Sequence, residues 1–598
     1  AGAPARIVKR TVRDFPGSFF PSKIIVPDVQ AVFDRVAVEA SRGCPHRCRF
    51  CQATSIYFPY RVKDPGRLMD TMRDSLRRTG FQDASLSSLS ISDYPYLDRT
   101  VRLLMEELSK EEVSLSLSSL RPQGLTSGLA ESILRVRKTG FTLVPEAGTE
   151  RLRRVINKDL TDDDIHRAAE AAFAGGWRLL KLYFMIGLPG ERREDLEAVV
   201  RLVKDLLARG EKILGRPPLI NLSLSSFIPK PHTPFQWLAM EDSGTLEEKR
   251  TSIIRDLRRH RSVEIKARRP EQSVLEAVFS RGDRRLLDVL RSAWRGGARF
   301  DGWKDRENDA PWREAFEKEG VDPGDYLGAL GLEDELPWDH IDTGLKKEHL
   351  AEELRRALRG EPTPSCLESD CGECRGCSPE FRPVKTFSGT VTLPSRPLEK
   401  AGEPSSQPVR YRAFYEKTGR ARYLAHNDLI NVLRRAFRRA GVSVVHTGGF
   451  HPKMRMSFLP AMPLGMAGLS EALEFVSDRL LEEGDFLERI NRSLPRGILF
   501  RSLKIRLPSD LSLSRDTAGF VYSLDLGSRE VLDAMKSLGE EGDAERVASA
   551  LVRAFPGGGV TASPASDGES IRFRVELQGG NPPRLQDAVA EVLRLESP

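Results

Sequence analysis

The sequence of 598 residues contains few cysteines and no long apolar run, and both absences limit what it can encode. No apolar stretch approaches the roughly 20 residues that cross a bilayer, and no signal peptide is visible. Seven cysteines confined to two short groups exclude a disulfide framework and favour metal binding in a reducing compartment. We therefore expect no membrane partner and a cytoplasmic location.

The length of the chain and its first residue set two further limits. A chain of 598 residues is too long for one hydrophobic core, and 39% hydrophobic with 30% charged residues is ordinary for a protein of several domains. The sequence opens at Ala1 without a methionine. We expect the chain to be a piece of a longer protein.

The first cysteine group is Cys44-Pro-His-Arg-Cys48-Arg-Phe50-Cys51. Three thiolates spaced C-x3-C-x2-C leave a 4Fe-4S cluster with one iron that lacks a protein ligand. Such an open iron is a reaction site. The alternative is a zinc knuckle or a chance trio, but zinc normally takes four ligands and the other cysteines lie more than 300 residues away.

This triplet, with the aromatic Phe50 before its last cysteine, resembles the signature of the radical S-adenosylmethionine (SAM) superfamily. The resemblance implies that Cys44, Cys48 and Cys51 hold a 4Fe-4S cluster whose open iron binds SAM. One electron then cleaves SAM into methionine and a 5′-deoxyadenosyl radical, which abstracts a hydrogen atom from the substrate. It also implies a partner that supplies electrons, such as flavodoxin or ferredoxin.

A repeated strand and helix pattern between residues 36 and 234 predicts an α/β fold, a partial (βα)6 barrel of radical SAM type. In such barrels the chemistry takes place at the carboxyl ends of the strands, where the first strand delivers the cysteines. The predicted strands are Val36–Ala40, Ala84–Ser92, Val113–Leu120, Phe141–Pro145, Leu179–Ile186 and Leu219–Phe227. The predicted helices are Leu68–Arg78, Arg99–Lys110, Leu129–Lys138, Asp162–Ala174 and Arg193–Leu207.

Three further motifs extend the resemblance over roughly residues 36–240. They are Val144-Pro-Glu146-Ala-Gly148, Tyr183-Phe-Met185-Ile-Gly187 and Phe227-Ile-Pro-Lys-Pro-His232. By resemblance, the cofactor-binding residues are Phe50, Ser90, Ser92, Ser118, Arg121, Glu146 and Met185. The two serines at positions 90 and 92 would replace a glycine-rich contact to the methionyl amine. For the serines, the alternative is a set of small residues alternating on buried strands.

The second cysteine group is C-x4-C-x2-C-x2-C, formed by Cys366, Cys371, Cys374 and Cys377. Four thiolates complete either a tetrahedral zinc site or a second 4Fe-4S cluster. The tight spacing favours iron–sulfur slightly. A cluster with all four ligands filled serves structure or electron transfer.

The region after the barrel resembles that of cobalamin-linked radical SAM proteins, which carry a cobalamin domain before the core and a radical SAM-linked domain after it. The Asp-x-His-x-x-Gly ligand motif of the cobalamin domain is not found in this sequence. Cobalamin is therefore expected only through a domain outside this chain.

A basic domain is predicted after residue 409, and its motifs around His426 and His451 resemble the radical SAM-linked domain. Its alternating strand–helix–strand pattern up to Pro598 predicts an α+β, ferredoxin-like unit. Between Arg410 and Arg455 there are eleven basic residues and only two acidic ones. The candidate nucleic-acid-binding residues, all on one predicted helix, are Arg434, Arg435, Arg438 and Arg439. Like charges at this spacing repel unless an anion such as phosphate meets them, although a solvated basic helix is an equal alternative.

The predicted organisation is an N-terminal linker (1–35), the barrel (36–240), a helical and cysteine-rich extension (241–386), a linker (387–408) and the basic domain (409–598). We predict a radical SAM enzyme that modifies, for example methylates, RNA or a ribosome-associated substrate. The alternatives are a cobalamin-linked enzyme acting on a small metabolite and a non-catalytic RNA-binding protein with structural metal clusters.

Overall fold

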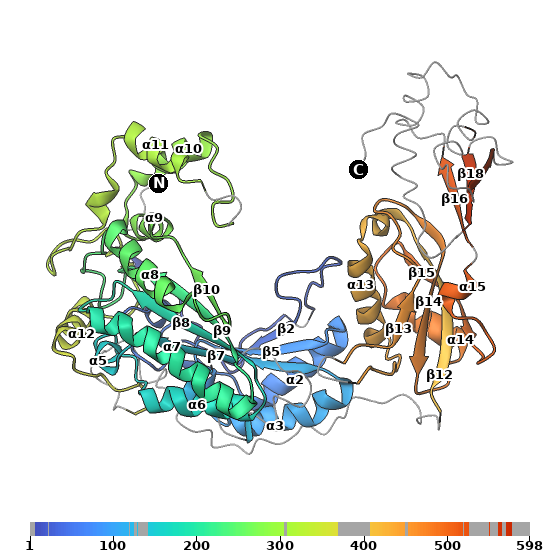
Figure 1. Cartoon of the computed structure of the whole chain (residues 1–598), viewed down its shortest axis with the longest axis horizontal. Coiled ribbons are helices and arrows are strands. Elements are labelled where there is room, and N and C mark those ends of the chain that lie inside the picture. Colours follow the sequence, from blue (N-terminus) through green and yellow to red (C-terminus); the bar gives the residue numbers. More distant parts are fainter. Residues whose placement is uncertain are drawn as a thin grey trace. The chain divides into compact units, whose positions relative to one another are not determined.

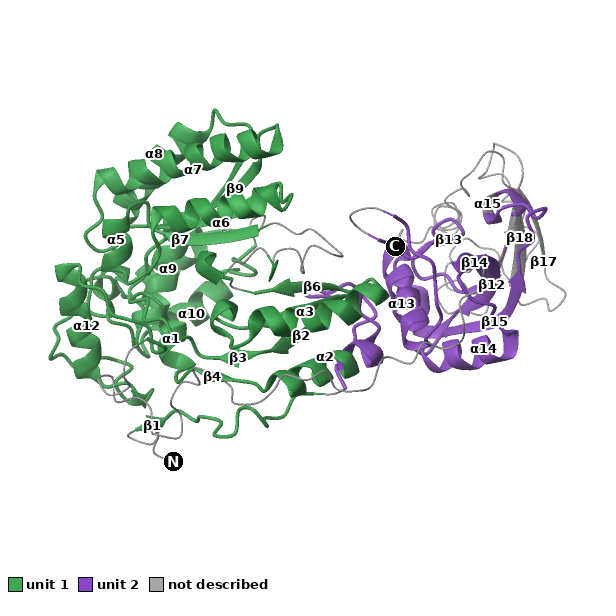
Figure 2. Ribbon diagram, turned by 90° about the horizontal axis from the view of Figure 1, so that it is seen from below, with its two compact units in different colours: residues 1–22, 35–74, 83–395 green, residues 23–34, 75–82, 396–598 purple. Residues whose placement is uncertain are grey.

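The structure is a computed structural model. It consists of two compact units (Figure 2). The first unit comprises Ala1–Ser22, Arg35–Asp74 and Asp83–Ser395, and the second Lys23–Asp34, Ser75–Gln82 and Arg396–Pro598. The structure describes residues 6–21, 23–118, 120–124, 128–129, 141–303, 308–368, 407–448, 452–517, 519–525, 549, 560–564 and 570–576.

The first unit opens with a parallel three-stranded sheet in the order β2-β5-β6 (Figure 1). Two amphipathic helices, α2 and α3, connect its strands, as parallel pairing requires. The bounds are β2 Val36–Glu39, α2 Pro65–Thr79, β5 Asp83–Ser87, α3 Leu97–Leu108 and β6 Ser114–Leu117. Between β2 and α2 lie β3 (Ser41–Arg42), α1 (Gln52–Ile56) and β4 (Arg61–Val62).

A second parallel sheet follows, with four strands in the order β10-β9-β8-β7. Because its strands run in one direction, their carboxyl ends lie at a common edge. The strands are β7 Phe141–Glu146, β8 Leu179–Ile186, β9 Leu219–Ser226 and β10 Val263–Ala267. The helices between them are α5 Glu150–Val155, α6 Asp162–Ala174, α7 Arg193–Leu214 and α8 Ser243–Leu257.

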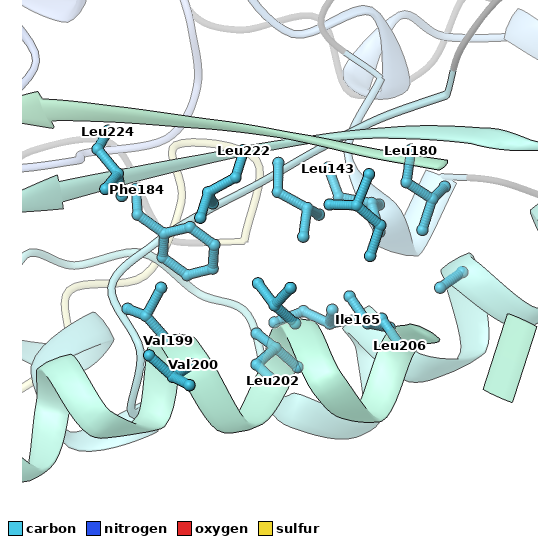
Figure 3. Packing of buried hydrophobic residues seen from close by; sticks show 14 of the residues in the cluster. Leu143, Ile165, Leu180, Phe184, Val199, Val200, Leu202, Leu206, Leu222 and Leu224 are labelled. Atoms are coloured by element: carbon cyan, nitrogen blue, oxygen red, sulfur yellow. The ribbon is translucent and has the colours of Figure 1, made fainter. Parts of the chain in front are cut away.

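The core of this second sheet lies between its strands and the helices α6 and α7 (Figure 3). Leucines and Phe184 alternate along the strands, so that one face of the sheet is apolar. Helix α6 starts with a capping box in which Thr161 and Asp164 bond each other's backbone N–H groups. The labelled core residues are Leu143, Ile165, Leu180, Phe184, Val199, Val200, Leu202, Leu206, Leu222 and Leu224.

The predicted α/β class is confirmed, with two main differences. The chain adds a parallel strand, β10, beyond the predicted end of the barrel at residue 240. The second predicted strand ends at Ser87 instead of Ser92, and Ile91–Asp93 forms a short 3-10 helix, η1. The physical reason is that the Ser88 hydroxyl accepts from the Ser90 N–H, an alternative to strand pairing.

Closure of the barrel is not tested by the described residues. No pairing joins β6 to β7 within the residues that the structure describes. The predicted helix Leu129–Lys138 lies, except for Leu129, outside the described residues. Closure into a single barrel therefore stays a prediction.

The extension after β10 is mainly helical, as predicted. Its elements are α9 Pro270–Arg281, α10 Leu286–Arg295, α11 Ala310–Lys318, β11 Ile341–Asp342 and α12 Lys347–Arg359. Strand β11 pairs with β1 (Ile7–Val8), so that part of the predicted N-terminal linker belongs to the first unit. Helix α12 packs on an apolar cluster that includes Leu152 of α5 and Trp237.

The second unit contains a β-α-β-β-α-β succession with the antiparallel sheet order β13-β14-β12-β15. This order is the ferredoxin-like arrangement that the sequence predicts. The elements are β12 Val409–Lys417, α13 His426–Arg439, β13 Met456–Phe458, β14 Gly468–Ser477, α14 Glu483–Arg492 and β15 Ile498–Ile505. Phe437 of α13 packs against Phe475, Phe486 and Phe500 at centroid distances of 5.0 to 6.0 Å.

Beyond this sheet lie α15 (Leu513–Asp516) and a small antiparallel sheet in the order β16-β18-β17. Its strands are β16 Gly519–Asp525, β17 Val560–Pro564 and β18 Ser570–Glu576. Across the described ranges of both units, no helix is long and apolar enough to span a bilayer.

Candidate active site

The three cysteines of the first group lie on one loop, here called the cluster loop (residues 43–51), which follows β2 and β3 and leads into α1. All three side chains are partly buried. Gly43 begins the loop at a φ of +84°, where a Cβ atom would lie 2.7 Å from the carbonyl oxygen of Pro59. The Cys51 N–H donates to the Cys48 carbonyl at 3.1 Å, and Cys51 caps helix α1. A glycine and a helix start therefore hold the thiols on one short loop.

Two thiols of the cluster loop, those of Cys44 and Cys51, have raised pKa values. Burial raises the pKa of the Cys44 thiol, and the neighbouring Cys48 raises it further. Burial and Cys48 likewise raise the pKa of Cys51. At such buried positions a cationic metal centre stabilises the thiolate form of each cysteine. This donor set fits an iron–sulfur cluster.

Within the described ranges, no three His, Cys, Asp or Glu side chains are arranged to hold a single metal ion. A cubane differs from a single ion because it distributes its cysteine ligands over separate irons.

Glu146 lies beside the cluster loop, at the carboxyl end of β7. Its carboxylate contributes to the raised pKa of Cys51. Burial raises the pKa of Glu146 itself, and the ammonium group of Lys158, 3.6 Å away, opposes this shift. Glu146 also has a left-handed backbone with a φ of +68°, which is rare for a residue with a side chain and is concentrated at functional sites. The structure thus brings this predicted residue next to the cysteines.

Phe50 and Met185 pack against the same apolar cluster, which includes Phe227, Phe235 and Trp237. Phe50 belongs to the cluster loop, and Met185 lies at the end of β8. Gly187 follows at a φ of +76°, and its N–H donates to Glu191 at 3.0 Å. The motifs of the cluster loop, of β8 and of the segment after β9 are therefore joined by one apolar cluster.

The four polar residues predicted on the first sheet make hydrogen bonds within the protein. The Ser118 hydroxyl donates to the Leu86 carbonyl at 2.9 Å, and the Ser92 hydroxyl accepts from the Arg121 N–H at 2.7 Å. The Arg121 guanidinium donates to the Asp159 carbonyl at 2.7 Å. Contact of Ser90, Ser92, Ser118 and Arg121 with SAM stays a prediction.

Sequence analysis missed a polar pair at the cluster loop, His46 and Asp93. The His46 Nε2 lies 2.9 Å from an Asp93 carboxylate oxygen, which also accepts from the Ser90 hydroxyl at 2.5 Å. Although burial opposes it, the hydrogen bond from His46 lowers the pKa of Asp93. The position of His46 inside the cysteine motif was the available signal, whereas Asp93 belongs to no motif.

Arg49, also within the cluster loop, is fully buried and connects the loop to α12 and the segment after it. Its guanidinium donates to Glu353 at 3.1 Å and to the Glu361 carbonyl at 2.7 Å. Further bonds reach the carbonyls of Arg154 and Val155 and the hydroxyl of Thr363. We call this set of contacts the Arg49 network. Because its partners lie up to 314 residues away, sequence reasoning did not find it.

Cys366, the first cysteine of the second group, is buried beside the cluster loop. Its N–H donates to the carbonyl oxygen of Pro45 at 2.8 Å. A pocket is lined by Cys44, Cys48, His349 and Cys366, among other residues. The remaining predicted ligands, Cys371, Cys374 and Cys377, lie outside the described residues.

Arginines of the basic helix α13 contact acceptors within the protein. Arg435 is buried and donates to Asp34 at 2.9 Å, and Arg439 donates to the carbonyls of Ser493 and Thr79. Asp34 and Thr79 belong to the same unit as α13. Binding of phosphate by Arg434, Arg435, Arg438 and Arg439 stays a prediction.

Two family models match the chain. Residues 38–203 match the radical SAM superfamily, and residues 410–553 match an uncharacterized protein family conserved in bacteria, DUF2344. The first match includes the cluster loop, Glu146 and Met185. The second begins near the start of β12.

Curated relatives match parts of the chain. An uncharacterized protein of Methanocaldococcus jannaschii is 32% identical over 42% of this chain and 53% of its own length. An anaerobic magnesium-protoporphyrin IX monomethyl ester cyclase of Rubrivivax gelatinosus is 25% identical over 29% of this chain and 31% of its own. A ribosomal protein uS12 methylthiotransferase of Herpetosiphon aurantiacus is 25% identical over 28% of this chain and 38% of its own. The chain spans about half or less of the length of these relatives.

Solved structures give partial matches. The methyltransferase TsrM from Kitasatospora setae, with cobalamin and a 4Fe-4S cluster bound, has 17% identity and a TM-score of 0.25 over 32% of this chain and 36% of its own. The cobalamin-dependent radical enzyme OxsB has 12% identity and a TM-score of 0.26 over 54% of each chain. The family models thus show that the chain contains a radical SAM domain over residues 38–203 and a C-terminal DUF2344 domain over residues 410–553.

Proposed function

We propose that this chain is a radical SAM enzyme whose cluster loop holds a 4Fe-4S cluster through Cys44, Cys48 and Cys51. The observation that carries the proposal is the placement of the three thiols on one partly buried loop, with Glu146 beside Cys51. When bound, the cluster supplies an open iron for SAM and the electron that cleaves it into methionine and a 5′-deoxyadenosyl radical.

The surrounding residues have separate roles in this proposal. Phe50 and Met185 provide apolar surface on the two elements that meet beside the loop. Glu146 offers a buried carboxylate that can accept hydrogen bonds from the SAM amine or ribose. The Arg49 network holds the loop in place, so that the cysteines are positioned before the cluster binds.

The test is anaerobic reconstitution with iron and sulfide, followed by reduction in the presence of SAM. The wild-type chain should bind a reducible 4Fe-4S cluster and release 5′-deoxyadenosine. Separate Cys44→Ala, Cys48→Ala and Cys51→Ala variants should lose both properties, because each lacks one cluster ligand. Ser457→Ala, an exposed change on β13, serves as the control. Normal SAM cleavage in the cysteine variants would refute the proposal.

For the substrate, we propose RNA or a ribosome-associated molecule that the radical modifies, for example by methylation. The relative from Herpetosiphon aurantiacus acts, by its name, on a ribosomal protein. Support within the chain comes from Arg434 and Arg438 on α13 and from Tyr423, which is 57% exposed and carries the Arg422 guanidinium 4.8 Å from its ring centroid. An exposed aromatic ring beside a cation is a platform on which bases stack.

Binding of structured RNA to the whole chain tests this part. Affinity should fall as salt rises, with a log–log slope of roughly −0.7 to −0.9 per neutralised phosphate. Absence of binding at low salt would favour a small metabolite, with cobalamin supplied by a domain outside this chain. RNA binding without SAM cleavage would favour the non-catalytic alternative.

A further inference from the structure

A small pocket lies within the second unit, beside the end of strand β12 and the start of helix α13 (Figure 1). Its lining combines polar side chains with an apolar wall. The polar side chains are those of Tyr415, Lys417, His426 and Glu471. The apolar wall consists of Leu429, Phe458, Leu459, Pro460 and Met462. All of these residues are described and belong to one unit, so the complete lining of the pocket is known.

Lys417 occupies a core-facing position of β12, where the pattern of the strand favours an apolar residue. The buried positions of this strand alternate, and those before Lys417 carry Tyr411, Ala413 and Tyr415. Lys417 continues the alternation and is only 1% exposed. Its ammonium group donates to the Leu424 carbonyl at 2.9 Å. A charged side chain at a position that the fold reserves for apolar ones points to a functional site.

Glu471 of the neighbouring strand β14 contributes a carboxylate to the same pocket. The pairing of the two strands is irregular here, since Tyr415 pairs with Glu471 but Lys417 pairs with Gly468. Such irregularities redirect side chains. A Cβ atom on Gly468 would lie 2.8 Å from a carboxylate oxygen of Glu471 and 2.9 Å from the methyl carbon of Met462. Gly468 therefore leaves room for the carboxylate over the backbone position that pairs with Lys417.

The two opposite charges influence each other without direct contact. Burial raises the pKa of Glu471, and the charge of Lys417 opposes this shift. Burial lowers the pKa of Lys417, and the charge of Glu471 opposes that shift in turn. In the described part of the chain, no hydrogen bond joins the two groups. Because a buried charge is costly unless a partner contacts it, a ligand with one positive and one negative group would stabilise both side chains.

The part of the pocket near Lys417 favours the negative group of such a ligand. His426 is the first residue of the 14-residue helix α13, and a helix N-terminus carries a partial positive charge. Burial lowers the pKa of the His426 imidazole, and the charge of Lys417 lowers it further, so the ammonium group lies near the ring. The same ring packs edge to face against Phe458 at a centroid distance of 6.1 Å. The anion-binding groups and the apolar wall are therefore adjacent.

From this arrangement we infer that the pocket binds a free α-amino acid with a small apolar side chain. The carboxylate of the amino acid pairs with Lys417, and its ammonium group pairs with Glu471. Its side chain lies against the apolar wall at Leu429, Phe458 and Met462. One carbon atom separates the two charged groups of an α-amino acid, which suits protein charges on directly paired strands. The inference does not depend on the cluster loop or on SAM cleavage.

Isothermal titration calorimetry of the whole chain tests the inference, with L-alanine as the probe. Propionate and ethylammonium are the matched controls, because each is L-alanine without one of its charged groups. L-Alanine should bind at one site and about tenfold more tightly than either control, since it alone engages both protein charges. Absence of L-alanine binding at millimolar concentration, or equal binding of either control, would overturn the inference.

Two variants of similar side-chain volume assign the charges. Lys417→Met should bind L-alanine no more tightly than ethylammonium, because the carboxylate has lost its partner. Glu471→Gln should bind it no more tightly than propionate. Lys504→Met on β15 and Glu488→Gln on α14, both exposed, should keep the wild-type affinity. Wild-type affinity in either pocket variant would overturn the inference, and the comparison of probes in the wild type decides it if a variant fails to fold.

Discussion

Arg49 in the cluster loop and Arg435 in helix α13 are both buried arginines next to sequence motifs, and both bond protein acceptors. Arg49 pairs with Glu353 and donates to three backbone carbonyls. Arg435 pairs with Asp34, donates to one backbone carbonyl and lies over the ring of Phe81 at 5.3 Å. A basic residue in a motif is therefore not by itself evidence of an anionic ligand.

The two arginines differ in what they connect. Arg49 fastens the cysteines of the first group to the segment that carries Cys366, so its contacts bear on chemistry. Arg435 fastens α13 to Asp34 and Pro27, and thereby removes itself from the phosphate-binding face. The following predictions separate the two cases.

The largest effect is expected from Glu353→Gln. This change leaves the Arg49 guanidinium buried without a counter-charge, which costs about 3 to 5 kcal/mol of unfolding free energy. Urea denaturation should show this loss, and iron binding at the cluster loop should weaken with it. The matched control is Glu352→Gln on the exposed face of the same helix, which should change neither quantity. Equal behaviour of the two variants would remove the role assigned to the Arg49 network.

A smaller coupling is expected between Arg435 and Asp34, because the Asp34 side chain is 25% exposed and solvent screens the pair. A double-mutant cycle with Arg435→Met and Asp34→Asn should give about 1 kcal/mol. The same cycle with Arg501→Met in place of Arg435→Met should be additive, since Arg501 pairs with Glu416. A coupling energy as large as the loss expected for Glu353→Gln would contradict the proposed difference between the two arginines.

RNA binding should depend on Arg434 and Arg438 rather than on Arg435. Arg434→Gln/Arg438→Gln should flatten the salt dependence by roughly 0.7 to 0.9 in log–log slope for each phosphate that is no longer neutralised. The matched variant Arg435→Gln should leave the slope unchanged. Filter binding at several salt concentrations measures both, and a slope that changes only in Arg435→Gln would reverse the assignment.

The smallest effect concerns His446. Burial lowers the pKa of its imidazole, and the charges of Arg438 and Arg434 lower this pKa further. The folded state therefore binds fewer protons than the unfolded state between this lowered pKa and the usual 6.5. His446 should therefore lower the free energy of unfolding as the pH falls from about 6.5 to the lowered pKa. Phosphates at the two arginines would offset their charge and raise the pKa of His446. An NMR titration with and without RNA measures this shift, and no shift on saturation would place the RNA elsewhere.

The sequence predicted local features well and long-range contacts poorly. The bounds of α6 and β8 agree with prediction, because the capping box and the apolar alternation that define them are local. The ferredoxin-like order of the second unit agrees as well. Strand β10 was missed although its five residues alternate between partly buried and exposed positions. The Arg49 network was missed because its partners are distant in sequence.

In the candidate site, too, local features were predicted and long-range contacts were not. Cys44, Cys48, Cys51 and Glu146 lie together as expected, because motif spacing and strand order determine their positions. The partners of Arg435 and of Cys366 depend on which distant segments pack against them. No property of either residue alone indicates those partners.

The amide of Asn157 bonds the backbone of two loops at once, at Arg47 and at Thr363, as a neighbouring strand would. This double contact determines how much of the chain must be inherited together. A recombination event that joined the barrel to a different downstream region at residue 240 would lose Glu353 and Thr363, and would leave Arg49 and Asn157 without their partners. The smallest heritable module that keeps the cluster loop intact therefore reaches at least to Cys366, well beyond the stretch by which the superfamily is recognised.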